Sequence, residues 1–263
     1  MAERLQHLIA TQRRWCKAFD RLLPARCTLD GALQFKQVVT PAYLASAMTV
    51  YDVGGGKHPF FEVEKKVRLG LHVCAIDITQ DELTVAPAGA YDEVFCADIC
   101  TFSGNHSADL VVCQAVLEHV SDTRAALRGI ASLLKPGAAA LVFVPCRNAL
   151  FARLNMLLPE KWKRRVLFTI FPGTGREHGF PAYYDRCTPR DFIDMAHAAG
   201  IRAETVYSYY MSVYFSFFLP AHVLWRIWQL LARYFFGDQV CESFSIVLRK
   251  PAEVALPRNH RFV

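Results

Sequence analysis

Tyr51-Asp52-Val53-Gly54-Gly55-Gly56 is the stretch of sequence that decides the fold. It joins the end of a short apolar segment, predicted as a strand over 48–53, to three consecutive glycines. Glycine lets the backbone pass close to a ligand, and the free amides at the start of a following helix can face a polar group on that ligand. The stretch therefore predicts a ligand-binding loop after the first strand of an α/β domain.

Strands and helices alternate after this loop. Further strands are predicted over 71–77, 92–97, 109–113 and 138–145, and helices near 58–68, 79–86 and 121–134. Thr79 and Glu82 have the spacing of a capping box, which predicts a helix start just after the second strand. Strands separated by helices at this spacing predict a Rossmann-like α/β fold with a doubly wound, mostly parallel sheet.

The other segments decorate this domain, which is predicted over 48–250. Residues 1–47 form a predicted helical cover over the sheet, with an amphipathic helix over 2–23 and a second helical stretch capped by Asp30. Thr188 and Pro189 predict a late helix start. Further strands are predicted over 201–208 and 241–249, apolar insertions over 149–188 and 209–239, and a tail over 251–263.

Composition limits the function classes. The 263 residues are 53% hydrophobic and carry a net charge of +6, and the mean hydropathy is +0.16. The nine cysteines include no CxxC pair, so buried reduced thiols are expected, with neither disulfides nor a metal site. No secretory signal is recognisable, and a cytoplasmic protein is expected. Aromatic residues cluster with aliphatic ones and not with Lys or Arg, so no nucleic-acid partner is expected.

Acids at strand ends define the expected cofactor. Asp77 ends the second predicted strand, where a carboxylate can accept both ribose hydroxyls of an adenosine ligand. Asp98 follows the third, where an acceptor can meet an adenine amino group. A nicotinamide dinucleotide site would need a third glycine where this chain has Pro59, so NAD is disfavoured.

These motifs together resemble the class I S-adenosylmethionine-dependent methyltransferases, in particular the large subgroup with a Leu-Glu-His-Val motif. The resemblance covers about residues 48–145, and the chain departs from it at Lys57-His58-Pro59, where the family has its third glycine. The matching pieces are Asp52–Gly56, Asp77, Ala97–Ile99, Asp109–Val120 and Leu133–Gly137.

The resemblance implies S-adenosyl-L-methionine as cofactor and assigns roles by position. Asp52 and the glycine loop would hold the amino-acid end, Asp77 the ribose and Asp98 the adenine. Gln114 and Ala115 would line the floor beneath the sulfonium. The implied cofactor-binding residues are Asp52, Gly54, Gly55, Gly56, Asp77, Ile78, Asp98, Ile99, Gln114 and Ala115.

Two histidines are candidate general bases for a hydroxyl acceptor, because imidazole exchanges a proton near neutral pH. His119 follows the fourth strand at the cofactor edge, and His178 lies in a glycine-flanked insertion loop. The alternative for each is a structural histidine. An acceptor that is already anionic needs no base.

Residues 211–236 hold much of the surplus apolar sequence. A helix starting at Pro220 has one polar stripe, and its other positions carry Trp225, Trp228 and aliphatic residues. A single membrane crossing is excluded because the strands on both sides must return to one sheet. The helix either lies in a membrane interface, which the basic cluster Lys161–Arg165 favours, or forms a lid or dimer face.

The sequence thus predicts a methyltransferase that acts on oxygen of a lipid-linked or apolar acceptor, such as a glycan, a quinone-like molecule or a natural product. It is expected at the cytoplasmic face of a membrane as a peripheral protein. The oligomeric state stays open. Two alternatives remain: an NAD(P)-dependent oxidoreductase, and a non-catalytic scaffold that binds the same cofactor.

Overall fold

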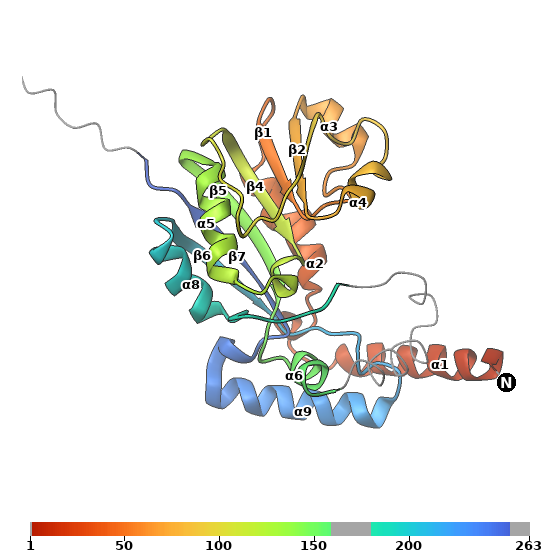
Figure 1. The fold of residues 1–263 in the computed structure, drawn as a ribbon. Coiled ribbons are helices and arrows are strands. Elements are labelled where there is room, and N and C mark those ends of the chain that lie inside the picture. Colours follow the sequence, from red (N-terminus) through yellow and green to blue (C-terminus); the bar gives the residue numbers. More distant parts are fainter. Residues whose placement is uncertain (1, 159–179, 253–263) are drawn as a thin grey trace, which may run out of the picture.

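The computed structural model describes residues 2–158 and 180–252. Within them a seven-stranded sheet has the order β3-β2-β1-β4-β5-β7-β6, and β7 alone runs antiparallel to its neighbours (Figure 1). This confirms the Rossmann-like, mostly parallel α/β fold. The strands are β1 Thr49–Val53, β2 His72–Asp77, β3 Glu93–Cys96, β4 Ala108–Gln114, β5 Leu134–Pro145, β6 Arg202–Tyr209 and β7 Ser243–Arg249.

Helices cover both faces of the sheet because side chains alternate along each strand. In β4, Val111 and Cys113 face one core with α5 and α8, whereas Leu110 and Val112 face a second core with Phe35. The helices are α1 Ala2–Asp20, α2 Gly31–Gln34, α3 Val63–Leu69, α4 Gln80–Thr84, α5 Thr123–Leu133, α6 Leu150–Leu157, α8 Pro189–Ala198 and α9 Leu219–Phe236.

The predicted helix over 58–68 is wrong at its start, because α3 begins only at Val63. A tertiary contact holds the preceding residues as a loop: Oδ2 of Asp52 accepts a hydrogen bond from the Phe60 amide at 2.8 Å. The predicted capping box is also absent. Thr79 is the N-cap of α4 but its side chain makes no capping bond, and Glu82 instead pairs with Lys57 at 3.4 Å.

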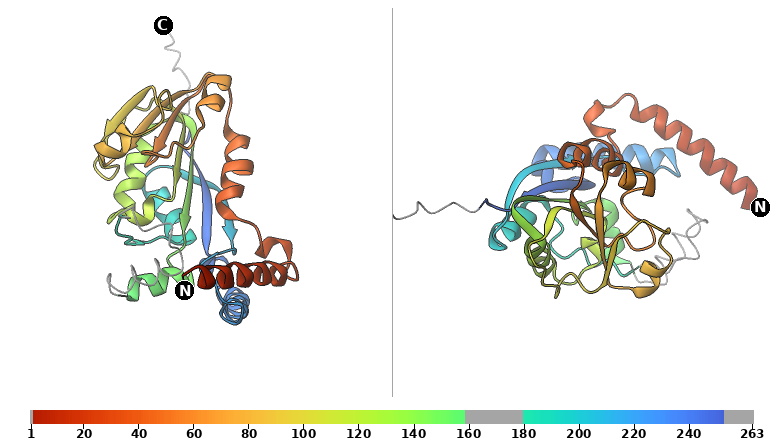
Figure 2. Two further views of the ribbon diagram at one scale, coloured as in Figure 1. Left: turned by 90° about the vertical axis from the view of Figure 1, so that its right-hand side faces the viewer. Right: turned by 90° about the horizontal axis from the view of Figure 1, so that it is seen from above.

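The N-terminal segment covers the sheet only in part. Asp30 caps α2 as predicted, by accepting a hydrogen bond from the Leu33 amide at 3.0 Å, and the turns that follow pack on the sheet. The prediction that the first helix also covers the sheet is wrong. α1 lies along α9 at one end of the molecule, where Gln12 accepts a hydrogen bond from the Leu219 amide at 2.8 Å (Figures 1 and 2).

Both apolar insertions leave the sheet at the same edge. α6 follows the carboxyl end of β5, and α9 connects the carboxyl end of β6 to the start of antiparallel β7. The carboxyl ends of β1, β2 and β4 lie at this edge too, since these strands are parallel to β5. In the described parts of the chain, no helix combines the length and apolarity that a membrane span requires.

Candidate active site

The glycine loop after β1 is tightly packed. The Gly54 amide donates to Ile76 O at 2.7 Å, and its φ of +76° lies in the left-handed region. A Cβ on Gly54 would lie 2.2 Å from the Val116 side chain, and one on Gly56 would lie 2.9 Å from a carboxylate oxygen of Asp77. The loop therefore needs glycine for conformation and for space, as expected where backbone approaches a ligand.

Asp52 stabilises the glycine loop through contacts of its carboxylate. Its buried carboxylate lies against Gly55, where a Cβ would come within 2.3 Å of Oδ2. Tyr91 donates a hydrogen bond to the Gly56 carbonyl at 3.0 Å and lies 3.4 Å from Asp52 Oδ2. Burial raises the pKa of Asp52 to about 6. Tyr91 is a site residue that the sequence did not reveal, because it precedes β3 in a stretch without a motif.

The other two strand-end acids follow β2 and β3, and Asp77 lies beside the glycine loop. Asp77 is half-buried, accepts a hydrogen bond from the Thr79 amide at 3.0 Å, and has a pKa that burial raises above its ordinary value. Asp98 follows β3 and accepts one from an amide two residues further on. Of their neighbours, Ile78 is exposed at the edge, whereas Ile99 packs into the core.

The end of β4 supplies the next part of the site. Gln114 is half-buried, and Ala115 is exposed with a φ of +55°, which is strained for a residue with a side chain. The Ala115 amide donates to Phe143 O at 2.8 Å, and this turn brings Val116 under Gly54. The structure thus brings the predicted residues after β1, β2 and β4 to one edge.

His119 is held with one nitrogen available to accept a proton. Its Nδ1 lies 3.1 Å from the Pro181 carbonyl oxygen, which can only accept, so Nδ1 carries the hydrogen. In the neutral ring Nε2 is then the acceptor. The Phe180 ring packs against the imidazole in an edge-to-face arrangement. His178, the other candidate base, lies outside the described residues, as does the basic cluster Lys161–Arg165.

Glu118 is the second functional side chain that had no predicted role, although it lies in the Leu-Glu-His-Val motif. Its Oε1 is 3.8 Å from Nε2 of His119, and its buried Oε2 has no hydrogen-bond partner. Burial raises the pKa of Glu118 to about 8. The Glu118 carbonyl accepts hydrogen bonds from the amides of Tyr183 and Tyr184, so residues 180–187 fold over the end of β4.

We expect Glu118 to make the protein less stable as the pH rises from about 4.5 to about 8. Its pKa is higher in the folded than in the unfolded protein. The contribution of Glu118 to stability is therefore fully present below the pKa of the unfolded state and is lost as the pH rises through the pKa of the folded state. Glu118→Gln removes the ionisable group. Its effect on the free energy of unfolding should therefore be more favourable at pH 8.5 than at pH 5, by on the order of 4 kcal/mol. Urea unfolding at both pH values measures the difference.

The exposed Glu64 gives the control for this prediction. Glu64→Gln should shift the free energy of unfolding by less than about 0.5 kcal/mol at either pH. Equal effects of Glu118→Gln at pH 5 and pH 8.5 would show that Glu118 ionises normally in the folded protein.

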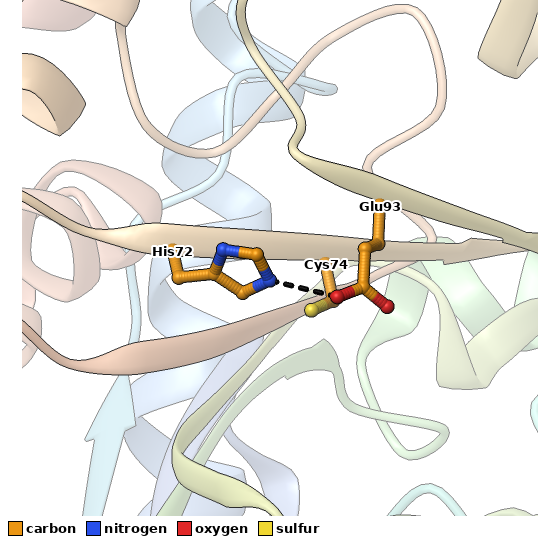
Figure 3. Close-up of side chains that lie close together, drawn as sticks. All are labelled: His72, Cys74 and Glu93. Atoms are coloured by element: carbon orange, nitrogen blue, oxygen red, sulfur yellow. Dashed lines mark hydrogen bonds and ion pairs between the residues drawn. The ribbon is translucent and has the colours of Figure 1, made fainter.

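A cluster of possible metal ligands lies elsewhere, at the start of β2. Ligand atoms of His72, Cys74 and Glu93 all lie within 4.8 Å of one another, and Nε2 of His72 is 2.9 Å from Glu93 Oε1 (Figure 3). His72 and Glu93 are exposed and already paired, and Asp92 is 3.8 Å from the other ring nitrogen. The cluster is remote from the glycine loop. All nine cysteines are free, and all but Cys96 and Cys100 are buried.

The sheet order, the glycine loop and the strand-end acids define a cofactor-binding methyltransferase site, and comparison with known proteins agrees. The chain matches the family described as a methyltransferase domain over residues 6–205. It belongs to the S-adenosylmethionine-dependent methyltransferases, and S-adenosyl-L-methionine is its cofactor. The alternatives of an NAD(P)-dependent oxidoreductase and a non-catalytic scaffold are therefore excluded.

Among its relatives, the chain is 37% identical over 209 residues to a ubiquinone biosynthesis O-methyltransferase of Xanthomonas axonopodis pv. citri, covering 77% of this chain and 81% of that one. It is 28% identical over 145 residues to a protein of the same name from Aeromonas salmonicida, covering 52% of this chain and 57% of that one. Haemonchus contortus phosphoethanolamine N-methyltransferase 2, solved with S-adenosyl-L-methionine, has the same fold, with a TM-score of 0.51, 18% identity and coverage of 91% and 57%.

Proposed function

We propose that this methyltransferase transfers the methyl group to a hydroxyl of a quinone-like, apolar acceptor at a membrane face. The observation that carries the proposal is the similarity to ubiquinone biosynthesis O-methyltransferases over most of the chain. The position of His119 supports it, because its Nδ1 is bonded to the Pro181 carbonyl, its Nε2 is left to accept a proton, and a hydroxyl must lose its proton as the new C–O bond forms.

Each site residue has a proposed role in holding the cofactor. Asp52 keeps the glycine loop closed around the amino-acid end, and Asp77 accepts the ribose hydroxyls. Asp98 faces the adenine, with the exposed Ile78 beside it, whereas the side chain of Ile99 is in the core. Gln114 and Ala115 line the floor under the sulfonium, where the positive charge disappears during transfer. An apolar surrounding favours that loss of charge.

The acceptor is proposed to enter beside His119. Phe180 and Tyr183 are exposed next to the end of β4, so an aromatic ring that carries a hydroxyl has apolar surface to pack against. His119 Nε2 would accept the hydroxyl proton.

The proposed acceptor class is tested by methyl transfer from labelled S-adenosyl-L-methionine. A catechol that carries a polyprenyl chain should be methylated on oxygen, and the same catechol without the chain should react with a lower kcat/KM. A phenol-free amine of the same chain length is the control. Transfer to the amine, or equal kcat/KM with and without the chain, would contradict the proposal.

We expect Asp77→Ala to weaken cofactor binding by about 1–3 kcal/mol, the range for a lost buried hydrogen bond to a polar group. Asp77 lies at the carboxyl end of β2, beside Gly56. Calorimetric titration with S-adenosyl-L-methionine measures the effect. Asp81→Ala is the matched control, because Asp81 is exposed in the next turn. Unchanged affinity in folded Asp77→Ala would remove Asp77 from the site.

A further inference from the structure

Helix α9 has its polar side buried and its apolar side exposed. Its polar residues His222, Arg226 and Gln229 are almost fully buried, whereas most of its large apolar residues face away from the protein. Trp225, predicted on the apolar face, is instead buried with the polar stripe. The exposed apolar residues of α9 are Leu224, Ile227, Trp228, Leu230, Leu231, Tyr234, Phe235 and Phe236. They are called the outward face below.

Specific polar contacts fix this orientation. Asp20 of α1 accepts hydrogen bonds from His222 at 2.8 Å and from Arg226 at 2.9 Å. Burial would raise the pKa of Asp20, but these two bonds outweigh it and hold the pKa below its ordinary value. Arg226 and Gln229 both donate to the Tyr210 carbonyl at 2.8 Å. Rotating α9 about its axis would break these hydrogen bonds, so they hold the outward face in its exposed orientation.

The neighbouring helices extend this surface. α6, α1 and α9 lie together at one end of the molecule (Figures 1 and 2). Leu154 and Leu157 of α6 are exposed. Between α6 and α9 an open groove of about 440 Å³ is lined by Arg153 and by Trp228 and Phe235. This is also the edge of the sheet at which the cofactor loop opens.

Charge on this end of the molecule is positive. Leu150–Leu157 and Leu219–Phe236 contain no Asp or Glu. Arg14 and Lys17 of α1 are exposed, and so is Arg21 in the turn that follows α1. Leu8 and Trp15 of α1 are also exposed, as is Leu22 in the turn after it.

We propose that the outward face of α9, together with α6 and α1, lies on the surface of an anionic lipid bilayer. An apolar helix face flanked by exposed Lys and Arg is the pattern of interfacial helices, which bury the apolar side among acyl chains and hold cations at head-group depth.

Docking in this orientation faces the methyltransferase site towards the bilayer. The carboxyl edge of the sheet carries the cofactor loop, α6 and α9, so an acceptor dissolved in the membrane reaches the site without crossing water. Docking on a bilayer is a separate proposal from the methyl acceptor, and vesicle binding tests it without any measurement of catalysis. A failure of the acceptor proposal would therefore leave it standing, and the reverse also holds.

The test is co-sedimentation of the full chain with vesicles of phosphatidylcholine alone or mixed with phosphatidylglycerol. The wild-type protein should bind only the mixed vesicles and should dissociate as salt is raised. Leu231→Glu with Phe235→Glu should reduce the partition coefficient more than about tenfold, since each added charge is unfavourable among acyl chains. Melting temperature and S-adenosyl-L-methionine affinity should stay unchanged, because both side chains are exposed.

The matched control places the same charges elsewhere. Val85 and Val67 are 64% and 72% exposed, against 55% and 71% for Leu231 and Phe235. Val85→Glu with Val67→Glu should therefore bind vesicles like the wild type.

The exposed cations of α1 and of the turn after it are tested separately. Arg14→Gln, Lys17→Gln and Arg21→Gln together should lower partitioning about 100-fold, since each cation near an anionic surface contributes roughly a fivefold gain. Neutralising the exposed Arg68, Arg124 and Arg128 in the same way is the control, with a smaller effect expected.

Two results would overturn the proposal. One is a wild-type protein that fails to bind the mixed vesicles. The other is a Leu231→Glu, Phe235→Glu variant that binds vesicles normally but changes oligomeric state in sedimentation velocity, which would make the outward face a contact between copies.

Discussion

Gly54→Ala is expected to destabilise the protein by about 2–5 kcal/mol and to weaken cofactor binding by about 10–100-fold. The first contribution is the left-handed φ of +76°, which costs a residue with a side chain about 1–2 kcal/mol. The second is overpacking, typically about 1–3 kcal/mol, because the new Cβ would lie 2.2 Å from Val116. The loop must shift to relieve the contact, and the shift displaces the amides that face the ligand.

Two further variants separate these contributions. Gly70 ends α3 with a φ of +60° and has nothing within 4 Å of a Cβ. Gly70→Ala should therefore cost only about 1–2 kcal/mol and leave cofactor affinity unchanged. Val116→Ala combined with Gly54→Ala should recover part of both losses. Denaturant unfolding and calorimetric titration provide the readouts. If Gly54→Ala behaves like Gly70→Ala, the contact with Val116 does not constrain the loop.

The local sequence pattern was sufficient to predict the strands and the edge of the sheet at which the candidate site lies. The strands that carry Asp52 and Asp77 at or next to their ends are largely apolar, as expected for a parallel sheet buried on both faces. Because parallel strands share a carboxyl edge, the strand-end acids had to converge there. The roles carried over from the family resemblance remain predictions, but their positions are consistent with one site.

Contacts between distant segments account for what the sequence did not reveal. The loop before α3 looked helical because its residues suit a helix, and only the bond from Phe60 to Asp52 shows otherwise. Tyr91 reaches the glycine loop from the segment before β3. Periodicity showed that α9 has a polar and an apolar side, but not which one faces inward. That depends on Asp20, about 200 positions away in the chain.

The sequence pattern of α9 does not determine which of its two sides is buried, because that depends on the partners available to its buried Arg226. Burying an unpaired Arg is very unfavourable, whereas burying Arg226 with Asp20, the Tyr210 carbonyl and Gln229 leaves most of its donors paired. Its guanidinium also lies 4.4 Å from the Trp225 ring centroid. Asp20 is available only after α1 has packed against α9, so the inward orientation of Arg226 depends on tertiary structure.

His119→Ala is expected to lower turnover with a hydroxyl acceptor by about 10²–10⁴-fold, the range for loss of a general base. The hydrogen bond from Nδ1 to the Pro181 carbonyl fixes the ring and leaves Nε2 as the proton acceptor. Cofactor affinity should stay within a factor of about two, because the proposed cofactor contacts come from other residues. A single-turnover assay with labelled S-adenosyl-L-methionine isolates the transfer step.

The dependence on pH distinguishes a base from a structural histidine. If transfer needs an unprotonated side-chain base, the wild-type rate should rise with pH. In His119→Ala this rise should vanish, and activity should return only at alkaline pH, where the acceptor hydroxyl itself ionises. His197→Ala, at an exposed position near the end of α8, is the control and should keep the wild-type profile. If His119→Ala retains the full rate and the same pH profile, another group removes the proton or the acceptor is bound as an anion.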